Sequence, residues 1–184
     1  MGLSSRRRKF LQLTSAFLGS FGMSNISVSY LVPLIPQTTT LTCWFAAAQM
    51  VTEYSSQRDQ KSTSEQSNLA MLGRRYDVFR VNQRLPYSAV VSFANDVGLR
   101  IANLSNACED LPATLQRCGP LWYMGRWRDD KAGNGHAVVI TGISDDAISV
   151  NDPLPVNQGT RRELPLQPFF DYLRELSTVP FLYA

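Results

Sequence analysis

Four side chains of this chain have the types and the order that nucleophilic catalysis by a thiol requires. Cys43 is expected in the first turn of a helix, where unpaired backbone N–H groups and the helix dipole stabilise a thiolate. The amide of Gln37 and the backbone N–H of Cys43 can both donate to an oxygen that becomes negative when a carbonyl is attacked. His136 can act as the base, and Asp152 can accept a hydrogen bond from its second ring nitrogen.

Two predicted elements have to bring these residues together. An alanine-rich helix should begin at Cys43, with Thr42 as its N-cap, and continue to about Gln57. His136 should begin an apolar strand that ends at Ile143, and a turn over residues 144–146 should return the chain along a second strand over 147–150. The resulting hairpin would place Asp152 beside His136.

The other predicted elements define the fold class. The chain is extended and apolar over 27–36, because Pro33 and Pro36 block a helix. Further helices are predicted over 62–74, from Pro86 to Gly98, over 112–118 and over 167–176, and further strands over 120–123 and 179–183. Helices come first and strands later, which predicts an α+β fold rather than alternating βαβ units.

Composition limits the classes of function. The chain has 184 residues, of which 44% are apolar, which is enough to form one globular domain with its own core. Apolar runs are too short for a membrane span. With a single histidine and no paired ligand spacing, a metal site is not expected, and without a glycine-rich phosphate loop we expect no cofactor.

Residues 1–24 have the layout of an export signal. The basic run from Arg6 to Lys9 precedes a moderately apolar segment, and Arg7-Arg8-Lys9-Phe10-Leu11 resembles a twin-arginine motif. We therefore expect an exported, periplasmic or secreted protein, with a secretion tail of a delivered effector as the alternative. Four of the eighteen basic residues lie in this leader, and the other fourteen are matched by fifteen acidic ones, so a nucleic-acid partner is not expected.

Beyond the leader we expect one domain over residues 25–184. From about Ser29 to Leu176 it resembles the papain-like cysteine proteases, most of all the bacterial avirulence-effector branch. The residues that carry the resemblance are Val32-Pro33-Leu34-Ile35-Pro36-Gln37, Thr42-Cys43-Trp44-Phe45-Ala46-Ala47, Gly119-Pro120-Leu121-Trp122, Gly135-His136-Ala137-Val138-Val139 and Asn151-Asp152-Pro153. Phe45 departs from the family pattern, in which a small residue is commoner.

The resemblance implies a two-lobed fold, with a helical N-terminal lobe and a small antiparallel sheet in the C-terminal lobe. It also implies a cysteine endopeptidase that acts on a protein or peptide, with Cys43 as nucleophile, His136 as base and acid, Asp152 as orienter and Gln37 as oxyanion donor. Asn151 is a lesser candidate for the orienting role. A cell-wall amidase, a transglutaminase-type acyl transferase and a non-catalytic binding module are the alternatives.

The remaining cysteines and two tryptophans have two interpretations each. Cys108 precedes the helix predicted over 112–118 and Cys118 ends it, and the two could form a disulfide or remain reduced core residues. Trp44 and Trp122 are core or cleft-wall aromatics, and we keep both as candidate substrate contacts. Trp44 follows Cys43 directly, and Trp122 is close in sequence to the loop before His136.

Overall fold

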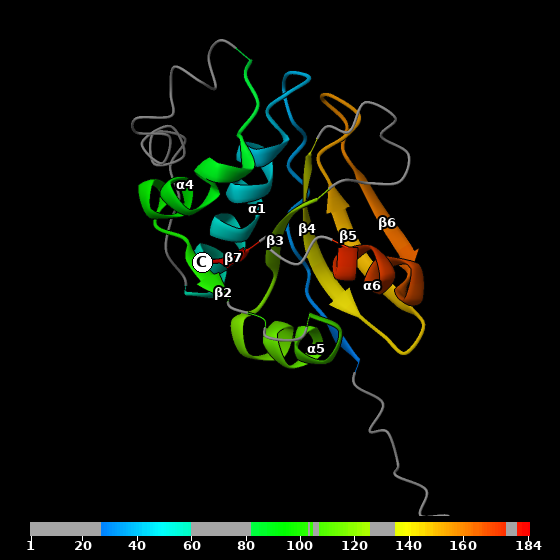
Figure 1. The fold of residues 1–184 in the computed structure, drawn as a ribbon. Helices are drawn as coiled ribbons and strands as arrows, with labels where there is room; N and C mark the ends of the chain where they lie inside the picture. The colour runs from blue at the N-terminus through cyan, green and yellow to red at the C-terminus, as the bar shows by residue number, and fades with distance from the viewer. Residues whose placement is uncertain (1–26, 60–81, 103, 105–106, 126–134, 176–179) are drawn as a thin grey trace, which may run out of the picture.

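The computed structural model describes residues 27–59, 82–102, 104, 107–125, 135–175 and 180–184 (Figure 1). The expected leader and the helix predicted over 62–74 lie outside these residues. Among the described residues, no helix is long and apolar enough to cross a membrane.

A seven-stranded antiparallel sheet forms the centre of the described structure. Its strand order is β2-β7-β3-β4-β5-β6, and β1 pairs with β4 beside this path. The strands are β1 (Val28–Ser29), β2 (Arg100–Ala102), β3 (Leu121–Gly125), β4 (His136–Ile143), β5 (Ala147–Asp152), β6 (Thr160–Pro165) and β7 (Phe181–Tyr183).

Helices cover both faces of this sheet (Figure 1). On one face lie α1 (Cys43–Arg58) and α4 (Val90–Val97), which is preceded by the 3₁₀ turn η2 (Tyr87–Ala89). On the other face lie α5 (Ala107–Cys118) and α6 (Leu166–Glu175). Side chains alternate along β3, so that Trp122 and Met124 face α1 whereas Leu121 and Tyr123 face α5 and α6.

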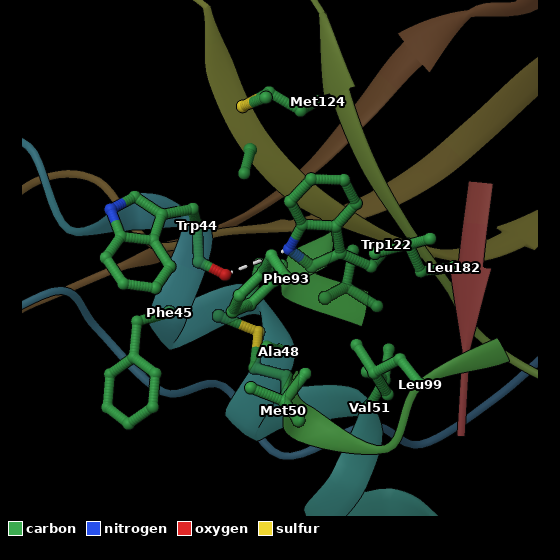
Figure 2. Close-up of a cluster of buried hydrophobic side chains, with 14 of the residues drawn as sticks. Trp44, Phe45, Ala48, Met50, Val51, Phe93, Leu99, Trp122, Met124 and Leu182 are labelled. Atoms are coloured by element: carbon green, nitrogen blue, oxygen red, sulfur yellow. Dashed lines mark hydrogen bonds between the residues drawn. The ribbon is translucent and has the colours of Figure 1, made fainter. Parts of the chain in front are cut away.

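The core between α1, α4 and the sheet is built around aromatic rings (Figure 2). Phe93 of α4 meets Trp44 edge to face at a ring-centroid distance of 5.2 Å and lies 6.0 Å from Trp122 of β3. Such pairs contribute about 0.5–1.5 kcal/mol beyond the burial of their area. This packing fixes the first turn of α1 against the middle of the sheet.

The α+β fold class is confirmed, and so are the helix from Cys43 and the hairpin of β4 and β5, whose residues Ile143 and Ile148 are paired. Some boundaries were wrong. The helix expected over 112–118 begins at Ala107 and includes Pro112. Strand β5 continues past Val150 to Asp152.

Strand β6 was missed altogether by sequence-based prediction. Its residues Arg161, Arg162 and Glu163 are exposed, because β6 is an edge strand of the sheet. Charged residues on an edge strand prevent pairing with other chains, and they also hide the alternation by which strands are recognised in a sequence.

Candidate active site

Cys43 is the first residue of α1, and its side chain is buried, with 7% of the residue exposed. Thr42 occupies the N-cap position, but its hydroxyl forms no capping bond; it lies 2.9 Å from the hydroxyl of Thr39 in the preceding turn. The first turn of α1 also contains no acidic side chain. No acidic side chain of this turn therefore offsets the positive end of the helix dipole, at which Cys43 lies.

The Cys43 thiol meets the beginning of β4. Its Sγ accepts a hydrogen bond from the backbone N–H of Ala137, with an N–S distance of 3.4 Å, and the His136 side chain forms a second hydrogen bond to it. The two residues are 93 positions apart in the chain, and the contact between α1 and β4 brings them together.

Asp152 holds the imidazole of His136 from the other side. The distance between His136 Nε2 and Asp152 Oδ1 is 2.6 Å. The backbone N–H of Leu154 donates to the same carboxylate oxygen at 2.9 Å, and Arg162 Nη1 donates to Oδ2 at 3.3 Å. Because Asp152 takes Nε2, Nδ1 is the ring nitrogen that remains for the thiol.

These contacts set the charge of the pair. Burial disfavours the imidazolium, but hydrogen bonds to Asp152 and Cys43, with the attraction of their charges, raise the pKa of His136 from 6.5 to about 9. Burial likewise opposes ionisation of Asp152, but the hydrogen bond and charge of His136, with Leu154 N–H and Arg162, lower the pKa of the carboxyl below its usual value. Both shifts favour an imidazolium–carboxylate pair at neutral pH.

Gln37 lies in the segment that leads to α1 and is 1% exposed. Its Nε2 donates to the carbonyl of Thr39 at 2.6 Å, which uses one of the two amide hydrogens. Its backbone is tied to the loop after Asp152, since Gln37 N–H donates to Pro153 O at 3.1 Å and Asn157 N–H donates to Gln37 O at 2.9 Å. The loop between β5 and β6 thus joins the Gln37 segment to Asp152.

Trp44 and Trp122 do not lie where a substrate could touch them. Their exposed fractions are 1% and 0%. The ring nitrogen of Trp44 donates to Gln83 O at 3.1 Å, and that of Trp122 donates to Trp44 O at 2.9 Å (Figure 2). A ring without accessible surface offers nothing to a bound peptide. The expectation of substrate contacts is therefore corrected, and both residues are core aromatics.

Two further residues, one on β6 and one on β5, lie next to the site. The pairing of β5 with β6 places Arg162 next to Asp152, a contact that the sequence pattern did not indicate. Asn151 points to the opposite side of β5 from Asp152, so it does not orient His136, and its amide donates to Val32 O at 3.1 Å. A strand predicted over β6, paired with β5, would have indicated that Arg162 lies close to Asp152.

The cysteines outside the site and possible metal ligands complete its description. Cys118 is a free thiol, whereas the side chain of its possible disulfide partner Cys108 lies outside the described residues. Within the described part of the chain, no group of three or more His, Cys, Asp or Glu could hold a metal ion.

Comparisons with known proteins identify a family and a similar fold. A family model described as papain-like cysteine protease AvrRpt2 matches residues 24–174. Among solved structures, the fold is similar to a double glycine motif protease from an AMS/PCAT transporter, crystallised with the leader peptide. The TM-score is 0.51 and the identity 22%, over 85% of this chain and 92% of that one. No curated protein matches the chain.

Proposed function

The chain belongs to the AvrRpt2 family of papain-like cysteine proteases, and from this premise we propose that it hydrolyses peptide bonds through an acyl-enzyme on Cys43. The observation that carries the proposal is the position of His136, which hydrogen-bonds the thiol of Cys43 and, at 2.6 Å, the carboxylate of Asp152. This order of nucleophile, base and orienter is what thiol proteases require.

In the proposed mechanism, the first step forms the acyl-enzyme. The Cys43 thiolate, beside an imidazolium and at the positive end of α1, attacks the peptide carbonyl carbon. The second amide hydrogen of Gln37 and the backbone N–H of Cys43 stabilise the carbonyl oxygen as it becomes negative. His136 then gives its proton to the leaving amine, and the C–N bond breaks.

The second step returns the enzyme to its starting state. Neutral His136 takes a proton from a water molecule, which attacks the thioester carbonyl and displaces the Cys43 sulfur as the new carboxylic acid leaves. Asp152 keeps the ring oriented throughout, because its Oδ1 is itself fixed by Leu154 N–H. The similar double glycine motif protease was crystallised with a leader peptide, which supports a peptide as the substrate class here.

Replacement of the nucleophile tests the proposal. Cys43→Ala should abolish peptide hydrolysis and labelling by an epoxide thiol-protease inhibitor, while far-UV circular dichroism and the unfolding temperature stay close to those of the wild type. Cys118→Ala is the matched control, because it removes the other free thiol of the described structure. It should keep both activity and labelling.

Other outcomes of this experiment identify the alternatives. Hydrolysis that persists in Cys43→Ala refutes the proposal. A wild-type protein that transfers an added amine to the acyl group, instead of releasing an acid, is an acyl transferase. A wild-type protein that neither cleaves peptides nor takes up the inhibitor near neutral pH is a binding module.

A further inference from the structure

Asn151 and Asp152 are neighbours in β5 and serve different parts of the site. Because side chains alternate along a strand, the two point to opposite sides. Asp152 holds His136 on one side. On the other side, Asn151 Nδ2 donates to the carbonyls of Val32, at 3.1 Å, and Pro33, at 3.4 Å, and Asn151 is 2% exposed.

The segment that Asn151 holds leads directly to Gln37. Pro33 and Pro36 have no backbone N–H, so this segment cannot pair with β5 as a regular strand. The carbonyls of Val32 and Pro33 therefore need a donor from elsewhere when they are buried, and the Asn151 amide is that donor.

The same segment is held again at its far end. Gln37 N–H donates to Pro153 O, and Asn157 N–H donates to Gln37 O. Segment 32–37 is thus attached to the end of β5 and the loop that follows it. Of these attachments, only the one from Asn151 is made by a side chain. It alone can therefore be removed by a substitution that leaves the backbone donors and acceptors in place.

We propose that Asn151 is a positioning residue, which docks the segment 32–37 on β5 and thereby places the Gln37 amide for the oxyanion. The inference rests on the proposed function, since it assigns Asn151 to the oxyanion part of that mechanism. Adjacent residues of β5 then position the two halves of the centre: Asp152 positions the base, and Asn151 positions the oxyanion donor.

Two reactions of Cys43 separate these halves. Alkylation by iodoacetamide needs the thiolate and His136 but forms no tetrahedral oxyanion, whereas peptide hydrolysis needs the oxyanion donors as well. Asn151→Ala should lower kcat for hydrolysis by roughly tenfold or more, a part of the effect of losing an oxyanion donor outright. Its alkylation rate and pH profile should stay close to those of the wild type, whereas Asp152→Asn should slow both reactions.

A double-mutant cycle with Gln37→Ala gives the second readout. If Asn151 acts through Gln37, Asn151→Ala should have little further effect on kcat once the Gln37 amide is gone. Ile148→Val is the control for general destabilisation, because Ile148 is buried in the same strand and belongs to the core on the other face of the sheet. It should leave kcat unchanged. If Asn151→Ala does not fold, Asn151→Ser, which keeps a shorter donor, takes its place in the cycle.

The inference and the proposed function fail in different ways. Two results overturn the inference alone. One is that the effects of the Asn151 and Gln37 substitutions on kcat multiply, and the other is that the alkylation rate falls in parallel with hydrolysis. A Gln37→Ala variant with wild-type kcat overturns the proposed oxyanion role, and the assignment of Asn151 falls with it.

Discussion

His136 is the only histidine of the chain, so its ionisation can be followed directly by NMR of a histidine-labelled sample. The pKa raised from 6.5 to about 9 corresponds to about 3 kcal/mol in favour of the imidazolium. Two opposing effects produce it, since burial lowers the pKa and the hydrogen bonds to Asp152 and Cys43 raise it. A substitution that removes one of these partners should therefore produce a large shift.

Asp152→Asn is the decisive perturbation. Asparagine keeps the size of the side chain but removes its negative charge, while the burial of the ring persists. The pKa of His136 should then fall by about one unit or more, toward 6.5 or below it. Cys43→Ala should lower the pKa by less, because the hydrogen bond to Asp152 remains.

The assay is a titration of the imidazole resonances of wild type and variants over a pH range that includes 6.5 and 9. The reasoning is refuted if wild-type His136 titrates near 6.5, or if Asp152→Asn leaves its titration unchanged. Chemical denaturation gives an independent check. A folded-state pKa raised above the unfolded one stabilises the protein fully below about pH 6.5, and this contribution is lost as the pH rises through about 9. His136→Gln should remove that pH dependence.

Two further predictions concern stability. Arg162→Met should lower the free energy of unfolding at pH 7, because it removes the ion pair with Asp152. The loss should be no more than about 1 kcal/mol, because Arg162 is partly exposed. This contribution comes through the lowered pKa of Asp152, so the difference should disappear as the pH falls below that pKa; urea titrations measure it. Arg161→Met, the same charge change on the opposite face of β6, should show no such difference. Gly98→Ala should cost about 1 kcal/mol in the same assay, from φ of +76° alone, since no atom lies within 4 Å of an added Cβ; a wild-type midpoint would contradict this.

The candidate site could be predicted where local sequence determines the element. The small residues after Cys43 favour a helix, and the apolar run after His136 favours a strand, so the structure places both residues at the ends of the expected elements. Asp152 could be placed because a short turn fixes the pairing of β4 with β5. The elements that carry Cys43, His136 and Asp152 can thus be recognised from patterns that span few residues.

The remaining contacts depend on tertiary structure, and local patterns do not contain them. The position of Arg162 requires the register of an edge strand whose charges hide it. The role of Asn151 depends on its contact with the segment 32–37, which lies more than a hundred residues earlier in the chain. The burial of Trp44 and Trp122 follows from how α1 and α4 pack on the sheet, because an aromatic residue next to a catalytic one suits a cleft wall as well as a core.

The alternation along β5 also determines which changes of length the gene can tolerate. Insertion or deletion of one residue within Ala147–Val150 would exchange the directions of Asn151 and Asp152, so that an amide would face the imidazole and a carboxylate would face two carbonyls. A change of two residues would restore the directions but move both side chains along the strand. We therefore expect length variation among homologues to be confined to the turns and absent from this strand, whereas substitutions at its half-exposed positions should be common.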